Sequence, residues 1–327
     1  EHHRTLGIPF EEWDLETLQQ RAPYLDIKSY YPPRRPDDEH FGESSGGTLT
    51  GAVFVPSGGY INDPQLSVHN VQRAAEAKGA TFRFNAEVTE IRRKDGRVQG
   101  ITLQDGEEID APVIVNVAGP HSFVINQMAG VDKTMKIKTR ALRHEVHYVP
   151  TPDSYDTKKN GHVTSDDDIA GYCRPETGNL LLVGSQDPEC DPKEWIDDPD
   201  NFKRNVSDEQ WRAQVLRLAQ RIPDLPIPGQ ARGVVDLYDV ADDWIPIYDK
   251  SDLGGYYMAV GTSGNQYKNG PIAGLLMAEL IEACEHGHDH DADPVKIKCP
   301  LTGLVLNAGF YSRNREINED SSFSVLG

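Results

Sequence analysis

The segment from Gly261 to Pro271 combines a glycine-rich turn with Lys268, and these residue types could hold an electron-rich or anionic group. It follows the apolar run 256–260 and precedes the apolar run 272–284. A strand, a glycine turn and a helix start aim backbone N–H groups and the positive end of the helix dipole at one point. This pattern predicts a ligand site, and a packing turn between strand and helix is the alternative.

A second turn lies upstream, where Val113–Val117 leads into Ala118-Gly119-Pro120. The apolar, β-branched run is typical of a strand buried on both faces of a parallel sheet. Glycine at its end lets the backbone approach a ligand closely, because no Cβ intervenes. We expect the turns at 118–120 and 261–268 to lie side by side, at the carboxyl ends of neighbouring strands, where α/β sheets bind ligands.

In their order along the chain, these segments resemble those of the D-amino-acid-oxidase-like flavoproteins, which include sarcosine oxidases, glycine oxidases and dimethylglycine dehydrogenases. The resemblance implies an α/β fold, with a Rossmann-like FAD-binding domain of discontinuous segments and a β-rich substrate domain. It assigns residues 1–55 mostly to the substrate domain and a connecting segment, and residues 141–232 to the substrate domain. Residues 56–140 and 233–327 are the expected FAD-binding segments.

The resemblance also implies that FAD is the cofactor and that three segments contact it. Val88 matches a strand residue whose backbone pairs with the adenine, although an ordinary core strand is the alternative. Ala118, Gly119 and Pro120 match a turn against ribose and phosphate. The third segment matches a loop beneath the isoalloxazine ring, in which N–H groups and a lysine stabilise charge on reduced flavin. Its expected contacts are Gly261, Ser263, Gly264, Asn265, Gln266, Tyr267 and Lys268.

Four further residues match positions on the substrate side of such sites. Tyr238 matches a substrate-side tyrosine, and a core aromatic is the alternative. Tyr172 and Arg174 are two residues apart and share one face if extended. Arg174 could bind a carboxylate through two parallel hydrogen bonds, unless it is a hairpin-end arginine in water. His144 lies on a strand-like run that approaches the flavin in relatives, and a polar strand edge is the competing interpretation.

The chain departs from the family pattern at three places. Relatives usually have histidine and glycine where this chain has Asn265 and Gln266. Sarcosine oxidases have a flavin-linked cysteine at the position of Asp236, so a thioether is excluded there. They also have an oxygen-activating lysine at the position of Leu182. Loss of that cation should slow O₂ reduction, because the developing superoxide loses its partner, and this favours a dehydrogenase over an oxidase.

The implied reaction is oxidation of the C–N bond of an amino acid or an N-methylated amine, with hydride transfer to flavin N5. We name no catalytic acid or base, because a neutral bound amine needs none, and the electron acceptor stays open. One alternative is C–OH oxidation of a 2-hydroxy acid or glycerol phosphate, with His144 as the base. The other is a non-catalytic subunit that needs a partner chain to complete a flavin site.

The sequence contains no G-x-G-x-x-G, the motif that opens chains of this family and cradles the pyrophosphate. The first matching segment is Gly51–Asp63, which relatives place well over a hundred residues from their start. We therefore expect a strand, this motif and a helix to precede Glu1 in the natural protein. The alternatives are a natural relative that binds no cofactor and a partner chain that supplies the motif.

Composition limits the partners. The 33 basic and 52 acidic residues give a net charge of −19, which opposes binding to nucleic acid and anionic membranes. No apolar run approaches the roughly 18 residues of a spanning helix. Four scattered cysteines indicate a reducing, cytoplasmic setting rather than a disulfide framework. The run His286–Asp291 alternates histidine and aspartate, but it lacks a closed ligand spacing, so we predict a solvated loop and no metal site.

Local patterns predict the elements that position these residues. A helix is expected within 11–25, and another begins at Pro64 with Asp63 as its N-cap. Strands are expected at 81–84 and 86–92, and an amphipathic helix at 211–221.

Overall fold

The computed structural model describes residues 2–159 and 161–325, and the chain divides into two compact units. Both units contain helices and sheets, as the α/β class predicts. Unit 1 comprises Glu1–Phe82, Glu145–Pro192 and Lys203–Asp236, and unit 2 comprises Arg83–His144, Lys193–Phe202 and Leu237–Gly327. These boundaries differ from the expected domains mainly at residues 56–82, which join unit 1, and at residues 193–202, which join unit 2.

Unit 1 is built on an antiparallel sheet. Its strands are β7 (Thr139–Pro150, which enters from unit 2), β10 (Leu180–Ser185), β9 (Gly171–Glu176) and β8 (Thr164–Asp166), paired in that order. The helix α5 (Asp208–Arg221) packs on β9 and β10. Trp211, Val215 and Leu218 on one side of α5 are buried in the core of this unit, which agrees with the predicted amphipathic helix.

The first elements of unit 1 are short. They comprise α1 (His2–Leu6), β1 (Glu11–Asp14), α2 (Leu15–Arg21), β2 (Gly51–Phe54) and α3 (Pro64–Glu76). The helix predicted within 11–25 is therefore wrong over its first four residues, because these pair with β2. Asp14 starts α2 instead, by accepting a hydrogen bond from the Thr17 N–H. Asp63 caps α3 in the same way, as predicted.

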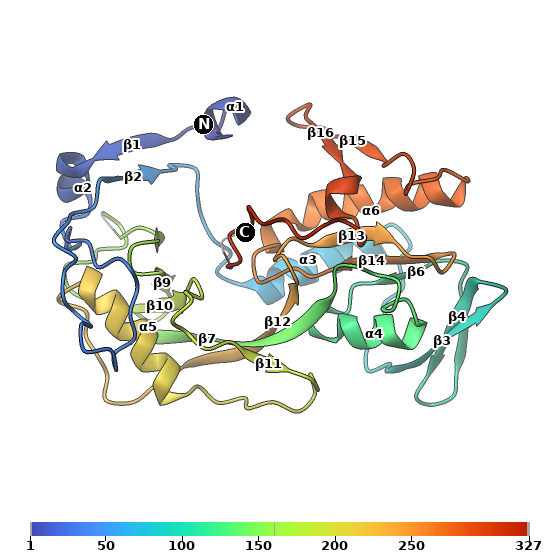
Figure 1. Cartoon of the computed structure of the whole chain (residues 1–327), viewed down its shortest axis with the longest axis horizontal. Coiled ribbons are helices and arrows are strands. Elements are labelled where there is room, and N and C mark those ends of the chain that lie inside the picture. Colours follow the sequence, from blue (N-terminus) through green and yellow to red (C-terminus); the bar gives the residue numbers. More distant parts are fainter. Residues whose placement is uncertain (1, 160, 326–327) are drawn as a thin grey trace. The chain divides into compact units, whose positions relative to one another are not determined.

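Unit 2 contains a three-stranded sheet of β13 (Ile247–Lys250), β14 (Tyr256–Val260) and β6 (Ile114–Asn116). β14 is parallel to β6 and antiparallel to β13. Figure 1 shows α4 (Ser122–Ala129) on one side of this sheet and α6 (Gly270–Glu285) on the other. Alternate residues of β14 enter the two cores: Met258 packs with the α4 side, and Tyr257 packs with Leu276 of α6.

The prediction that the 113–117 strand is buried on both faces is wrong in part. The strand is parallel to its neighbour, but Val115 is 37% exposed and Val117 is 66% exposed. β6 ends the sheet order among the described residues, so it has a neighbouring strand on one side only.

The remaining strands belong wholly or partly to unit 2. β3 (Val88–Lys94), β4 (Arg97–Leu103) and β5 (Glu108–Asp110) form an antiparallel sheet. β11 (Glu194–Ile196) and β12 (Gly233–Ala241, which enters from unit 1) pair with β7, and β15 (Lys296–Lys298) pairs with β16 (Val305–Asn307). Residues 81–84 form no strand, so that prediction is wrong. The short helices are η1 (Gly119–His121), η2 (Tyr267–Asn269) and η3 (Ala308–Tyr311).

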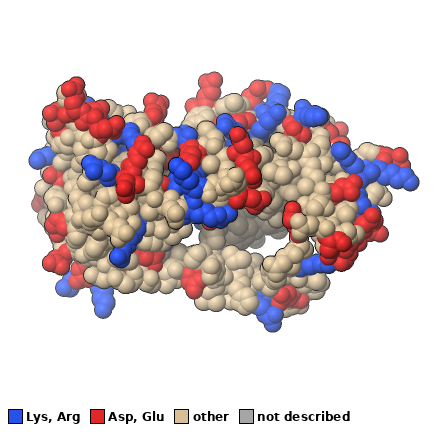
Figure 2. All heavy atoms as spheres, turned by 90° about the horizontal axis from the view of Figure 1, so that it is seen from below, with Lys and Arg blue, Asp and Glu red and all other residues tan. Residues whose placement is uncertain are grey.

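The surface carries charges of both signs. On the face drawn in Figure 2, acidic and basic side chains are interspersed. Within the described part of the chain, no helix combines the length and the apolar character needed to cross a membrane.

Candidate functional site

The turn after β14 has a backbone that favours glycine. Gly261 and Gly264 have φ angles of +72° and +78°, and Ser263 has +50°, a region that side chains disfavour. A Cβ on Gly261 would lie 2.9 Å from the Cβ of Ala241 in β12. The buried Ser263 hydroxyl donates to the Gly261 carbonyl (3.1 Å) and accepts from the Ala241 N–H (3.3 Å). Contacts with β12 therefore fix the conformation of the glycine loop, residues 261–264.

The turn at 118–120 leaves the same end of the sheet as this loop, which confirms that expectation. β6 and β14 are parallel neighbours, and each turn follows the carboxyl end of its strand. The buried Asn116 fixes the turn by accepting from the Ala118 N–H (3.1 Å) and donating to the Ser122 carbonyl (2.9 Å). Gly119 has φ +57°, and a Cβ there would meet nothing within 4 Å. The backbone at Gly119 is therefore open to a close approach.

The side chains after the glycine loop form an amide network with one donor left over. Gln266 donates to Asn265 Oδ1 and accepts from Asn269 (2.6 Å) and the Tyr248 hydroxyl (3.4 Å). Asn265 is 7% exposed, and its Nδ2 has no hydrogen-bond partner among the described residues. Leaving a buried donor unsatisfied costs about 1–3 kcal/mol. A bound acceptor would remove that cost, so the loop fits a ligand with acceptor atoms.

The start of α6 also favours a ligand with acceptor atoms. Pro271 lies in its first turn, and Asn269 at its N-cap makes no side-chain capping bond, so the first N–H groups of the helix keep their positive character. Tyr267 and Lys268 lie just before it and are exposed. Lys268 forms no ion pair with any of residues 2–159 or 161–325.

Tyr238 and His144 lie together at the glycine loop. Their rings stack at 4.6 Å between centroids with an interplanar angle of 20°. A Cβ on Gly264 would lie 2.6 Å from Tyr238 Cε2, so the tyrosine ring packs directly against the glycine. The structure thus brings together two of the predicted substrate residues and one predicted cofactor residue, all within unit 2.

Tyr172 and Arg174 belong to unit 1, on β9. Arg174 donates to Glu176 (2.8 Å), and its guanidinium lies 4.7 Å from the centre of the Tyr60 ring. The Tyr172 ring lies over Gly184, where a Cβ would be 2.1 Å from Tyr172 Cζ. Both side chains are thus held by neighbours from their own unit.

The cysteines are free, and Cys173, beside Tyr172, is buried. Burial raises the pKa of the Cys173 thiol to about 12, so it is an inert core residue at neutral pH. Val88, the predicted adenine contact, begins β3 and pairs with Leu103 of β4.

Asp239 on β12 belongs to this site, although the sequence analysis did not select it. It is 2% exposed and accepts a hydrogen bond from the Gly261 N–H (2.6 Å). Burial raises the pKa of its carboxyl to about 7, although the bond from the Gly261 N–H and the nearby hydroxyls of Ser122 and Thr139 act to lower it. The available signal was an acidic residue inside the strand that also carries Tyr238.

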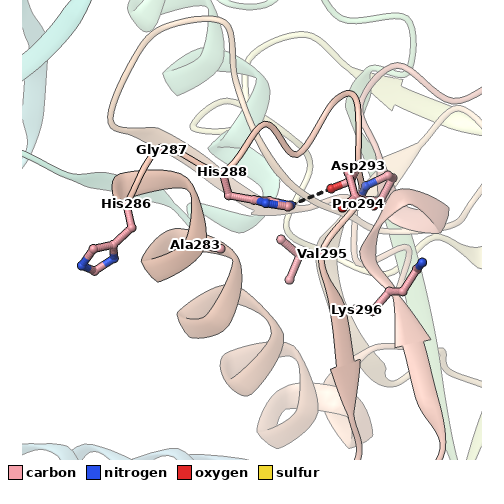
Figure 3. A pocket seen from close by; sticks show the side chains of 8 residues that line it. All are labelled: Ala283, His286, Gly287, His288, Asp293, Pro294, Val295 and Lys296. Atoms are coloured by element: carbon pink, nitrogen blue, oxygen red, sulfur yellow. Dashed lines mark hydrogen bonds between the residues drawn. The ribbon is translucent and has the colours of Figure 1, made fainter.

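A separate shallow pocket lies at the C-terminal end of α6 (Figure 3). It is lined by Ala283, His286, Gly287, His288, Asp293, Pro294, Val295 and Lys296. α6 has 16 residues, a length of roughly 24 Å, so the pocket is far from the glycine loop. His286 and His288 already bond backbone carbonyls, both at 2.7 Å. The described residues contain no group of three or more His, Cys, Asp or Glu side chains placed to hold a metal.

His290 contradicts the prediction that the 286–291 run is entirely solvated. It is 1% exposed; its Nδ1 accepts from the Val295 N–H (3.1 Å), and its Nε2 lies 3.4 Å from Asp249 Oδ1. The buried Arg313 also pairs with Asp249 (3.0 Å). The run is therefore partly drawn into the protein, because a buried carboxylate on β13 gathers polar partners around it.

Comparison with known proteins matches a protein-family model described as FAD dependent oxidoreductase to residues 1–280. The chain is similar to the glycine oxidase of Geobacillus kaustophilus, with 24% identity over 244 residues. It is also similar to the sarcosine oxidase subunit beta of Rhodobacter capsulatus, with 26% identity over 234 residues. These alignments cover 74% and 71% of the chain, but only 58% and 52% of the relatives.

Two solved structures are similar over almost the whole chain. A glycine oxidase from Geobacillus kaustophilus has a TM-score of 0.65 at 20% identity, covering 97% of this chain and 70% of that one. An L-proline dehydrogenase from P. horikoshii has a TM-score of 0.68 at 18% identity, covering 95% and 69%. At these identities the likeness establishes the fold.

Proposed function

The chain belongs to the family of FAD-dependent oxidoreductases, and we propose that it oxidises the C–N bond of an amino acid or an N-methylated amine. The observation that carries this proposal is the parallel pairing of β14 with β6, which places the turns at 118–120 and 261–268 at one end of the sheet. Relatives described as glycine oxidase and as sarcosine oxidase subunit beta support the substrate class.

In this proposal the glycine loop and the first turn of α6 hold the electron-rich edge of the flavin ring. Asn265 Nδ2, buried without a partner among the described residues, would donate to it, and Lys268 would add a positive charge. Ala118, Gly119 and Pro120 would lie against ribose and phosphate, and the backbone of Val88 against adenine. FAD, when bound, supplies the hydride acceptor, and the chain orients the substrate and excludes water.

The substrate would lie next to the stacked rings of Tyr238 and His144, because these pack against Gly264 in the loop. As a separate proposal within unit 1, Arg174 would bind a carboxylate in place of its present bond to Glu176. Tyr172 shares the strand β9 with Arg174. We assign no acid or base, because an amine bound in its neutral form needs none.

We propose a dehydrogenase rather than an oxidase. Leu182 occupies the position at which sarcosine oxidases have an oxygen-activating lysine, and its side chain in β10 is 7% exposed and apolar. No cation at that position would stabilise developing superoxide. Electrons would then pass to an acceptor other than O₂.

The pyrophosphate turn is proposed to lie on another segment. Residues 1–327 contain no G-x-G-x-x-G, and the chain spans little more than half the length of the curated relatives that it matches. The proposed source of the motif is a segment outside residues 1–327, such as a partner chain.

The proposed function is tested on the full natural protein, or on this chain with its partner. Flavin absorbance of the purified protein should be present, and anaerobic addition of amino acids or N-methylated amino acids should bleach it. Re-oxidation by an artificial electron-accepting dye should be faster than re-oxidation by O₂. A protein that binds no flavin would contradict the proposal, and bleaching by 2-hydroxy acids alone would contradict the substrate class.

The alternative substrate class, with a C–OH bond, needs a base for the hydroxyl proton. The observation in its favour is the position of His144, whose ring stacks on Tyr238 at the glycine loop. His144→Gln should abolish flavin reduction by a hydroxy acid, whereas reduction by a neutral amine should change by less than about tenfold. The same variant thus distinguishes the two classes.

A further inference from the structure

Asp239 links the glycine loop to its surroundings through two groups. Its Oδ2 accepts from the Gly261 N–H (2.6 Å), and its backbone carbonyl accepts from the Ser263 N–H (2.7 Å). Ser263 in turn binds Ala241, two residues further along β12. The first and third residues of the loop are therefore both fixed by one aspartate.

The same carboxyl faces the element that follows the second turn. The hydroxyls of Ser122, the first residue of α4, and of Thr139, the first residue of β7, lie close enough to affect the pKa of Asp239. Within ordinary hydrogen-bond geometry, however, Asp239 Oδ1 and both hydroxyls have no partner among the described residues. One buried carboxyl thus lies between the glycine loop and the start of α4.

We propose that Asp239 is a positioning residue that aligns the glycine loop with the start of α4, and that its carboxyl takes up a proton from solvent when negative charge accumulates at the loop. The identity of that charge rests on the proposed function: it is the charge that a two-electron reduction leaves on bound FAD. On two-electron reduction, the flavin and the Asp239 carboxyl together then take up at most one proton more than the flavin would take up alone.

The surroundings of Asp239 suit both protonation states. Burial is the main cause of its raised pKa, and the groups that oppose it are the Gly261 amide and the hydroxyls of Ser122 and Thr139, all of them uncharged. Hydroxyls accept as well as donate, so they can bond to the carboxylate and to the protonated acid. With its pKa at about 7, a small increase in nearby negative charge protonates the group at neutral pH.

The first test needs no flavin. Amide hydrogen exchange of Gly261 and Ser263 is measured by NMR on the full chain between about pH 5.5 and 8.5, corrected for the intrinsic rates. The protection of Gly261 should rise about fivefold as pH increases through 7, because an ionised acceptor binds more strongly than a neutral one. Asp239→Asn should abolish this step. Asp242→Asn, which changes an exposed carboxyl near the same strand end, should retain it.

The second test uses the FAD-loaded protein and measures the two-electron midpoint potential against pH. Above pH 7 the midpoint potential of the parent should fall more steeply with pH than that of Asp239→Asn. The difference should correspond to one extra proton taken up on reduction, which is a tenfold change in the reduction equilibrium constant per pH unit. That change corresponds to about 30 mV per pH unit. Equal slopes, or a fivefold protection step that survives in Asp239→Asn, overturn the proposal.

If Asp239→Asn does not fold, infrared difference spectroscopy of the parent replaces it. A carbonyl band of a protonated, buried carboxyl should appear when the flavin is reduced at about pH 8, and its absence overturns the proposal. A protein that binds no flavin contradicts the proposed function instead. The hydrogen-exchange step then still decides whether Asp239 holds the loop in a proton-dependent way.

Discussion

Lys268 is the charged side chain whose contribution should appear most directly in a rate. It is exposed and adjoins the start of α6. If it stabilises charge that forms on reduction, Lys268→Met should slow anaerobic flavin reduction by about 10²–10³ and change substrate affinity far less. Stopped-flow absorbance measures both quantities.

The matched control for this prediction is Lys94→Met, which removes another exposed lysine of unit 2, at the end of β3. It should leave the rate unchanged. A Lys268→Met protein reduced within about twofold of the parent rate would show that Lys268 is an ordinary surface lysine.

Gly264 should tolerate no side chain, for two reasons that act together. Its φ is +78°, and a Cβ would lie 2.6 Å from the ring of Tyr238. Gly264→Ala should destabilise the folded chain by about 1–3 kcal/mol and displace Tyr238 from its stack on His144. Urea unfolding measures the first effect, and the near-ultraviolet circular dichroism of the tyrosine reports the second.

Gly274→Ala is the control, since Gly274 lies within α6 and a Cβ there meets nothing within 4 Å. It should stabilise the chain by about 0.5–1 kcal/mol, because alanine is the better helix former. If Gly264→Ala and Gly274→Ala destabilise the folded chain equally, the conformation of the glycine loop is not the cause of the destabilisation by Gly264→Ala.

At the scale of elements, buried polar side chains fasten the segment after α6 to the sheet. Burial lowers the pKa of His290, an effect that Asp249 beside it opposes but does not cancel. In the unfolded chain, the imidazole of His290 takes up a proton at its ordinary pKa of about 6.5. The stabilisation from neutral His290 is therefore complete above about pH 7 and declines as pH falls, by at most about 1.4 kcal/mol per pH unit.

The measurement is the difference in unfolding free energy between the parent and His290→Gln. It should shrink from about pH 7.5 to pH 5. The comparison with a variant is needed because Asp239 changes the stability of the protein in the opposite direction. Its carboxyl binds a proton more tightly in the folded chain than in the unfolded chain, so the stability that this proton contributes is lost as pH rises towards 7. His286→Gln, an exposed control, should show a difference that is constant with pH. A constant difference for His290→Gln would contradict the assignment.

The elements that the sequence predicted well depend on neighbouring residues. The glycine turn between β14 and α6, the Asp63 cap and the hydrophobic stripe of α5 all follow from local spacing. Strand formation at 81–84 failed because a strand exists only where another strand pairs with it, and composition does not show the partner. The burial of His290 and Asp239 was not predicted, for a related reason. Whether a polar side chain is buried depends on residues far away in the sequence, such as Arg313 and Gly261.

At the scale of the whole molecule, we predict that any bound FAD is not joined to the chain at the matched position. Asp236 is an exposed residue of β12, and by the resemblance to sarcosine oxidases it occupies the position of their flavin-linked cysteine. Acid precipitation of the loaded protein should therefore release the flavin into the supernatant. Flavin retained in the pellet would indicate a covalent bond elsewhere, and mass spectrometry of a proteolytic digest would locate it.

The division into two units also limits how such a protein can change. The chain passes from one unit to the other at 82/83, 144/145, 192/193, 202/203 and 236/237, which makes five passages. A single recombination event therefore cannot exchange one unit and leave the other intact. His144 and Tyr238 lie within two residues of two of these passages, on β7 and β12. If His144 and Tyr238 contact the substrate as proposed, point substitutions that change substrate preference would fall on these two strands.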